Sequence, residues 1–349
     1  MLKKFIIIIF IGIMFVLTVS VLIGGFSGDT DKDNNKINKA GDDIEKYKFK
    51  PNDIVFNKSN GVGASIKVYI TKDKEIKELS MEEYTRGVVA SEMPAEFNIE
   101  ALKAQAIAAR TFAAAHMDSY GGKPYHGAKG ADVTDTVDCQ VYMAKDDRLK
   151  SWPQRLSGEY WNKITEAVQS TEGEVLKYHG KLIMEPLYFS VSSGKTEDSK
   201  EVIGDDEPYL KSVISSGEET DKKYKSVVKI SYGDFINKIK KTYSNSDLNY
   251  LNIRNSIQIL SKTKAGGVKE IKLGKNTITG IKFRSIMGLN STNFSVKYNI
   301  TSLEIDCTGY GHDVGMSQNG ANVMAKNGKT CSDILHHYYT GITLGKLED

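Results

Sequence analysis

The sequence predicts an α+β fold of mixed helices and short strands, with a cleft and an inserted smaller lobe, preceded by one transmembrane helix. Helical and strand patterns follow one another without the regular strand–helix–strand rhythm of a parallel sheet. The 349 residues are 40% apolar and 26% charged, which is the composition of a globular protein. The net charge of +3 is too small to indicate a nucleic acid partner, and none is expected.

The N-terminus carries a long apolar run. Lys3 and Lys4 are followed by no charged residue until Asp29, and residues 5–26 are almost wholly apolar. About 20 such residues cross a bilayer, whereas a cleaved secretory signal has a shorter apolar core and a small-residue cleavage site. We predict an uncleaved single-pass anchor over residues 1–28, with a cleaved signal as the alternative. The two lysines place the N-terminus in the cytoplasm and the remaining chain outside the cell membrane.

The rest of the chain divides by composition. Residues 29–60 are rich in Asp, Asn, Lys and Gly, as in a solvated linker. A core domain is expected to begin over residues 61–221. Lys, Tyr, Ser and Asn then become more frequent, which indicates an inserted lobe over residues 222–300. The core domain is completed by residues 301–349, where glycine-rich segments return.

Start and stop signals define the first helix. A strand is expected over residues 65–69, where β-forming residues alternate. Ser80 then acts as the N-cap and Glu83 completes a capping box. The helix must end near Met93, because the residue before Pro94 disfavours helical geometry.

Similar signals place the later elements. A second, Ala-rich helix is expected to begin after Asn98 and to end near Met117. Further helices are expected over residues 161–170, 232–242, 279–287, 320–326 and 330–339. Further strands are expected over residues 175–178, 182–189, 268–273 and 293–298.

Glu92 lies at the end of the first helix among apolar neighbours. The partial negative charge of a helix C-terminus disfavours a carboxylate there, and so does burial. Both effects raise the pKa of the carboxyl group, so that it can donate a proton near neutral pH and take one back. The residues alone leave a second interpretation open, in which Glu92 is an ordinary acid on a solvated helix face.

The Ala-rich helix carries two cations on one face. Lys103, Ile107 and Arg110 follow one another at helical spacing, and Gln105 lies on a different side. One interpretation is a solvated basic stripe. The other is a set of hydrogen-bonding groups for a polar ligand such as a sugar.

Two further stretches are rich in turn residues. Residues 188–197 combine small hydroxyl side chains with Gly194 and Lys195, but they lack the spacing of a phosphate-binding loop or a nucleophile elbow. Residues 309–321 hold four glycines, which predict tight bends, together with His312. Each stretch is either an ordinary turn or part of a ligand site.

No cofactor is expected, although zinc stays open. Possible zinc ligands are Cys139, Cys307, Cys331, His126, His312, His336 and His337. They show no Cys-x-x-Cys or His-x-x-x-His spacing, which argues against a metal site. A Cys307–Cys331 disulfide also stays open, because its geometry cannot be judged from the sequence.

These stretches closely resemble the stage II sporulation protein D family of spore-forming bacteria, including a domain shared with amidase-enhancer proteins. The shared segments cover about residues 62–345 in family order. They include Glu-Met-Pro, Leu-Lys-Ala-Gln-Ala-x-Ala-Ala-Arg-Thr, Ser-Gly-Lys-Thr-Glu and Gly-x-Gly-His-x-Val-Gly-Met-Ser-Gln. Two positions depart from the family: Asp313 replaces the usual Gly, and Asn319 replaces a frequent Tyr.

The resemblance implies a lytic transglycosylase that cleaves the bond between N-acetylmuramic acid and N-acetylglucosamine in peptidoglycan. Glycan strands without stem peptides are the preferred substrate, and anhydromuramic acid is the product. Glu92 matches the family's catalytic glutamate, and it serves first as acid and then as base. The matching positions assigned to substrate binding are Lys103, Gln105, Arg110, Tyr188, Ser192, Gly194, Lys195, His312, Ser317 and Gln318.

The resemblance also implies a biological setting. The enzyme would act during spore engulfment, between the mother-cell and forespore membranes, with stage II sporulation proteins P and M as partners. A non-catalytic amidase-enhancer or peptidoglycan-binding module is the main alternative function. A secreted metalloenzyme is a third.

Overall fold

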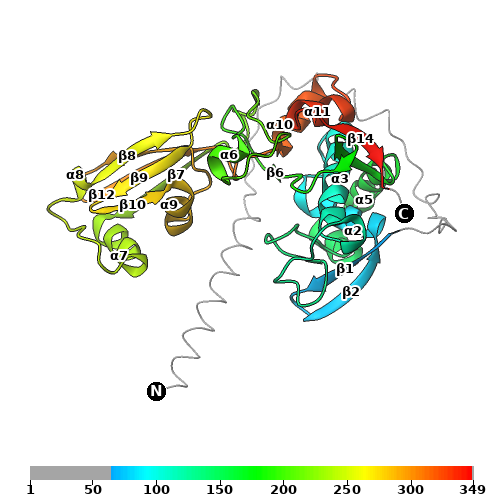
Figure 1. The fold of residues 1–349 in the computed structure, drawn as a ribbon, viewed down its shortest axis with the longest axis horizontal. Helices are drawn as coiled ribbons and strands as arrows, with labels where there is room; N and C mark the ends of the chain where they lie inside the picture. The colour runs from blue at the N-terminus through cyan, green and yellow to red at the C-terminus, as the bar shows by residue number, and fades with distance from the viewer. Residues whose placement is uncertain (1–63, 348–349) are drawn as a thin grey trace, which may run out of the picture. The chain divides into compact units, whose positions relative to one another are not determined.

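The computed structural model describes residues 64–347, and it confirms the expected mixture of helices and short strands (Figure 1). The anchor predicted over residues 1–28 and the linker predicted over residues 29–60 lie outside the described residues. Within residues 64–347, no helix combines the length and the apolar character needed to cross a membrane. The described residues all belong to one compact unit.

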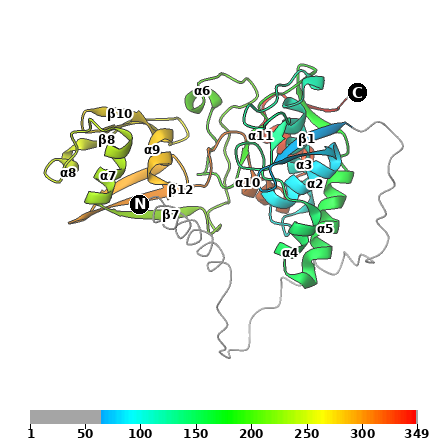
Figure 2. The same cartoon turned by 90° about the horizontal axis from the view of Figure 1, so that it is seen from below.

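Three helices pack against one another in the first part of the chain. They are α2 (Met81–Glu92), α3 (Ile99–Ala115) and α5 (Gln154–Gln169) (Figures 1 and 2). The many alanines of α3 are buried, and small side chains allow the neighbouring backbones to approach closely. Since α3 also contacts β4, α10 and α11, it is the central helix of this core.

Polar side chains cap four of the helices that the sequence predicts, and the Ser80 cap was itself predicted. The side chains of Ser80, Asn98, Thr279 and Thr330 each accept a backbone N–H from the first turn of the following helix. Such caps satisfy N–H groups that have no partner inside the helix.

Small sheets and short helices surround the three helices. The strands are β1 (Ser65–Ile70), β2 (Glu75–Ser80), β3 (Val133–Thr134), β4 (Glu174–Tyr178), β5 (Lys181–Leu182), β6 (Tyr188–Phe189), β13 (Met316–Ser317) and β14 (Thr343–Lys346). The strand orders are β2-β1-β3, β14-β4-β5 and β13-β6. The helical segments are η1 (Asp118–Tyr120), α4 (Lys145–Ser151), α6 (Ser199–Val202), α10 (Gln318–Lys326) and α11 (Cys331–Tyr338). The parallel β6–β13 pair matters for the site because it joins two distant motifs.

A separate hydrophobic core lies between Tyr232 and Cys307. Its strands are β7 (Lys225–Ser231), β8 (Ile257–Lys262), β9 (Val268–Leu273), β10 (Asn276–Thr279), β11 (Phe294–Tyr298) and β12 (Ser302–Thr308). They form two antiparallel sheets in the orders β11-β12-β7 and β10-β9-β8 (Figure 1). Its helices are α7 (Tyr232–Thr242), α8 (Ile253–Ser256) and α9 (Gly280–Met287). Phe283 is buried in this core and stacks on Phe294.

Some predicted boundaries are wrong. The helix predicted from Trp161 begins at Gln154, directly after Pro153. Its residues before Trp161 include only two apolar ones, Leu156 and Tyr160, and they include Gly158, which lowers helix propensity. The strand predicted over residues 182–189 is split into β5 and β6, and Pro186 between them lacks the N–H of a strand ladder. The helix predicted from Gly320 begins at Gln318, because the Ser317 side chain caps it. The strand β2 is exposed along most of its length and was missed for that reason.

Candidate active site

The Glu92 carboxylate closes α2 and accepts hydrogen bonds from two other segments. Its Oε1 accepts the Val141 backbone N–H at 2.9 Å, and its Oε2 accepts the Gln318 side-chain amide at 3.4 Å. Burial raises the pKa of Glu92, and these two hydrogen bonds lower it by a smaller amount. The pKa therefore lies above that of an ordinary glutamate, as the sequence predicted.

Two glutamines face each other beside this carboxylate. Gln318 begins α10 and Gln105 lies in the middle of α3, and both side chains are almost completely buried. The Gln318 amide nitrogen lies 3.5 Å from the Gln105 carbonyl oxygen. The Gln105 amide nitrogen is buried and has no hydrogen-bond partner among the described residues. The structure therefore brings three predicted site residues, Glu92, Gln105 and Gln318, into one cluster.

Tyr188, on β6, belongs to the same cluster. Burial first, and the nearby Glu92 charge second, raise the pKa of Tyr188 well above its ordinary value. Its buried hydroxyl lies near Gln140 without a hydrogen bond of good geometry, and the Gln140 amide nitrogen is also unpaired within residues 64–347. The Gln140 carbonyl oxygen accepts the Tyr84 hydroxyl at 3.1 Å. Buried donors without partners are rare in proteins, so this group offers unused hydrogen bonds to a polar ligand.

Ser192 and Ser317 meet at a different carboxylate, Glu218. The Glu218 Oε2 accepts the Ser192 backbone N–H at 2.9 Å and the Ser317 hydroxyl at 2.7 Å, while its Oε1 accepts the Ser215 hydroxyl at 2.6 Å. Burial raises the pKa of Glu218, against the effect of these hydrogen bonds. Glu218 therefore links the segment that follows β6 to the segment of β13, the two strands that pair with each other. It was missed because its partners lie 26 and 99 residues away and a lone glutamate in a loop gives no signal.

We expect Glu218→Ala to lower the free energy of unfolding by about 2–3 kcal/mol, because three buried donors lose their acceptor. Glu218→Gln keeps an acceptor and is expected to cost less. Burial raises the pKa of Glu218 in the folded protein above its value in the unfolded chain. The stability that Glu218 contributes therefore falls as pH rises between these two pKa values. Over that pH range, the difference in free energy of unfolding between the wild type and the Gln variant should become smaller. Urea unfolding at several pH values measures both effects. Glu219→Ala, at an exposed neighbour, is the control, and a Glu218→Ala protein as stable as that control would contradict the prediction.

His312 and Asp313 form the bend before β13. The His312 ring packs near Phe189, and its Nδ1 accepts the Val314 backbone N–H at 3.2 Å. Burial, with the Arg284 charge second, lowers the pKa of His312 to about 4, so the ring is neutral at physiological pH. Asp313 has φ +62°, a left-handed conformation that glycine adopts most easily and that Asp tolerates. A glycine, which the family resemblance leads us to expect at this position, would adopt this conformation without strain.

Lys103 and Arg110 are engaged within the protein itself. Arg110 is fully buried and forms a two-point ion pair with Glu82, with N–O distances of 2.8 and 2.6 Å. Lys103 pairs with Glu100 at 2.7 Å. A solvated stripe on this helix face is therefore wrong, because Arg110 and Ile107 are inaccessible to solvent. Arg110 can therefore position Glu82, but it exposes no surface that could contact a ligand directly.

Gly194 and Lys195 lie in the turn after β6. Gly194 has φ +113°, which side chains rarely adopt, and its N–H donates to the Ser192 hydroxyl at 3.2 Å. Lys195 is half-buried and forms a backbone bridge with Ile214. Together they shape the turn that carries Ser192.

The structure also shows where the cysteines and the possible metal ligands lie. Cys139, Cys307 and Cys331 are free, so the Cys307–Cys331 disulfide is not formed in this structure. Among residues 64–347, no three His, Cys, Asp or Glu side chains gather as a metal site would require.

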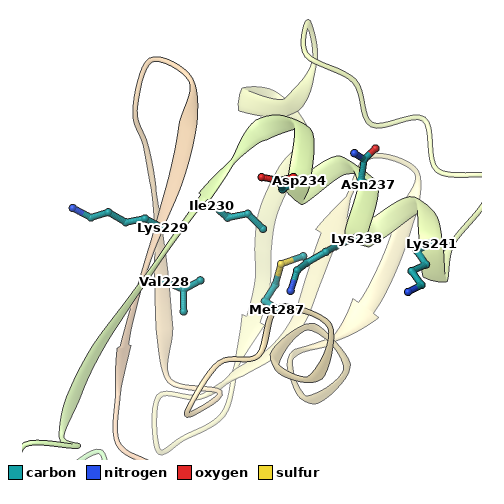
Figure 3. Close-up of a pocket in the computed structure, with 8 residues that line it drawn as sticks. All are labelled: Val228, Lys229, Ile230, Asp234, Asn237, Lys238, Lys241 and Met287. Carbon is teal, nitrogen blue, oxygen red and sulfur yellow. The ribbon is translucent and has the colours of Figure 1, made fainter. Parts of the chain in front are cut away.

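A pocket of about 490 Å³ lies between β7 and α7, and none of the predicted site residues lines it (Figure 3). The predicted cleft around Glu92 thus stays a prediction.

Comparisons with known proteins agree with these motifs. A family model described as SpoIID, stage II sporulation protein, matches residues 69–178. Stage II sporulation protein D of Bacillus subtilis is 38% identical over 284 residues, which cover 81% of this chain and 80% of the relative. The protein of the same name from Bacillus amyloliquefaciens is 37% identical over a similar length, covering 79% of the relative. The amidase enhancer of B. subtilis is 30% identical over 74% of this chain and 40% of its own length. The extent of these matches shows that the chain belongs to the stage II sporulation protein D family.

Proposed function

We propose that this protein is a peptidoglycan lytic transglycosylase that uses Glu92 as its only acid and base. The observation that carries the proposal is the Glu92 carboxyl group, which burial holds at a raised pKa. Among the described residues, only the Val141 N–H and the Gln318 amide donate to it. Such a carboxyl group can be protonated before the reaction and ionised after the first step.

In the proposed reaction, Glu92 donates its proton to the glycosidic oxygen between N-acetylmuramic acid and N-acetylglucosamine. The bond from the muramic C1 to that oxygen breaks. The muramic C6 hydroxyl then bonds to C1, and its proton returns to Glu92. The product is an anhydromuramic end, and no water is consumed. One carboxyl group is sufficient, unlike the two needed in most glycoside hydrolysis.

The unpaired donors near Glu92 support a sugar as the ligand. The Tyr188 hydroxyl and the amide nitrogens of Gln105 and Gln140 are buried without good partners within the described residues. Sugar hydroxyl and acetamido oxygens accept such hydrogen bonds, and this pairing would recover the cost of burying the three groups. We therefore propose that these side chains orient the glycan.

The setting follows from the family and is part of the proposal. The substrate would be glycan strands that have lost their stem peptides, cut during spore engulfment. The partners would be stage II sporulation proteins P and M. The protein would be held at the membrane by its N-terminal residues, with residues 64–347 between the mother-cell and forespore membranes.

Mass spectrometry of digested strands tests the proposal. A protein of residues 51–349 is incubated with denuded glycan strands, and the masses of the released fragments are measured. Anhydromuramic ends are expected; they are lighter by one water than the reducing ends of a hydrolase. If no fragment appears from stripped strands, the enzyme proposal fails.

A second candidate function is a non-catalytic module that stimulates an amidase. The likeness to the amidase enhancer of B. subtilis favours it. This function predicts that the protein binds strands without cutting them and accelerates an added amidase. The same digestion separates the two functions, because only the first gives anhydromuramic ends without any amidase.

The pH profile reports on Glu92 separately. Activity should fall as pH rises through the raised pKa of Glu92, because the protonated carboxyl group is lost. The Gln318 hydrogen bond lowers that pKa, so Gln318→Leu should raise it further and move the alkaline limb of kcat/KM to higher pH. A shift to lower pH would contradict the assignment of this limb to Glu92.

A further inference from the structure

The positive charge of the chain is concentrated in residues 222–300. This segment has 16 Lys and Arg against three Asp and Glu, a net charge of +13, whereas the whole chain carries only +3. The remaining residues together are therefore acidic, at −10. A protein surface with so strong a local excess of one charge attracts ligands of the opposite charge.

The same part of the chain exposes large apolar side chains. Leu251 is 96% exposed, Ile300 is 89% exposed and Tyr250 is 69% exposed. Residues of these types are usually buried, and each one costs free energy in water. We call these three residues the apolar tip.

Several contacts bring the two loops of the apolar tip to one end of α7. The Tyr232 backbone N–H donates to Thr301 at 3.0 Å, and its hydroxyl donates to Asn299 at 2.7 Å. The Arg254 guanidinium donates to the same Asn299 oxygen at 2.6 Å. The Tyr250 hydroxyl fills the space that a Cβ on Gly233 would need. The loop before α8 and the turn between β11 and β12 therefore both lie beside the start of α7.

The pocket between β7 and α7 begins at this end. Ile230 and Asp234 flank the start of α7, and both line the pocket (Figure 3). Lys238 and Lys241 on α7 also line it, together with Lys229 on β7, whose side chain points away from α7 (Figure 3). A surface with apolar side chains at a tip and lysines beside it has the features of proteins that bind the membrane interface.

The carboxylates near the start of α7 do not cancel the positive charge of residues 222–300. Asp234 accepts the Ser231 hydroxyl at 2.7 Å, and Asp247 accepts the Lys275 backbone N–H at 2.9 Å. Glu304 lies 3.3 Å from Lys229. The segment keeps its large excess of cations after these carboxylates are counted.

We propose that the apolar tip and the lysines of this pocket dock on a bilayer that contains anionic lipids. The lysines would meet lipid phosphates, and the aliphatic side chains would enter the interface. A soluble polyanion would satisfy the lysines but would leave Leu251 and Ile300 in water, which is why the observations favour a bilayer. This inference does not rest on the proposed enzyme activity or on the N-terminal residues.

Vesicle sedimentation tests the proposal. A protein of residues 51–349, which lacks the N-terminal apolar run, is mixed with vesicles of phosphatidylcholine alone or with 30% phosphatidylglycerol. Binding is expected only with the anionic lipid, and it should weaken as salt rises. The Leu251→Asp/Ile300→Asp variant is expected to bind at least tenfold more weakly. The control is Val137→Asp, at an equally exposed valine outside the basic segment, and it should bind as the wild type does.

Three outcomes would overturn the proposal. They are no binding to anionic vesicles, equal binding to neutral vesicles, and full binding by the Leu251→Asp/Ile300→Asp variant. Tight binding of soluble polyphosphate with no vesicle binding would assign the lysines to a polymer. Should that variant fold poorly, Leu251→Trp gives a second measurement. Its fluorescence should be quenched by brominated anionic lipid, whereas Val137→Trp should not, and equal quenching would overturn the proposal too.

Discussion

Replacing Glu92 with glutamine is expected to lower the release of anhydromuramic ends by about 10²–10⁴-fold, the usual contribution of an acid or base group. Glutamine has the same shape, and its carbonyl oxygen can still accept the Val141 N–H. It has no proton to give to the glycosidic oxygen and cannot take one from the C6 hydroxyl. The rate of fragment release, followed by mass spectrometry, measures the effect.

Glu83→Gln is the matched control for this variant. Glu83 lies on the same helix but is exposed, so its loss should leave the rate unchanged. Binding of the Glu92→Gln protein to insoluble strands should also be retained, because the proposed sugar contacts come from Tyr188, Gln105 and Gln140. Wild-type rates in the Glu92→Gln protein would remove Glu92 from the chemistry and favour the binding-module function.

Local signals predicted much of the fold because helix caps act over three residues. Ser80 was recognisable as a cap, and the helices expected after Asn98 and from Thr279 and Thr330 also begin at these residues, which cap them in the structure. Strands gave weaker signals, as β2 illustrates. Its side chains are mostly exposed and show no alternation, so its place is set by pairing with β1. Pairing partners are not encoded in a short window of sequence.

The candidate site could be predicted only in part, because its geometry depends on distant residues. The raised pKa of Glu92 followed from its helix end and apolar neighbours. Its hydrogen-bond donors did not, since Val141 and Gln318 lie 49 and 226 residues away. Glu218 was invisible for the same reason. The opposite error occurred at Arg110. Both interpretations of its helical spacing placed the cation on an accessible helix face, whereas the side chain is buried against Glu82.

The Arg110–Glu82 pair is expected to have the largest effect on stability. Arg110 also donates to the carbonyl oxygens of Glu174, at 2.9 Å, and Val168, at 3.4 Å, so one side chain joins α2, α3, α5 and β4. Removing the arginine leaves the partly buried Glu82 carboxylate without its cation and with the Gly173 N–H as a donor. Arg110→Met should therefore lower the free energy of unfolding by about 3–5 kcal/mol, measured by urea denaturation.

Four further variants separate the possible causes. Arg155→Met, at an exposed position on α5, should be nearly neutral. Arg110→Lys keeps the charge but cannot make the two-point contact with Glu82. Its free energy of unfolding should therefore lie between those of Arg110→Met and the wild type. Adding Glu82→Leu to Arg110→Met should recover part of the loss, because no carboxylate is then left unpaired. Glu82→Leu alone is the fourth variant. If the double variant loses as much stability as Arg110→Met and Glu82→Leu added together, packing of the arginine is the cause. If the double variant recovers stability but not the rate of fragment release, the pair also positions α2 and thereby the carboxyl group of Glu92 at its end.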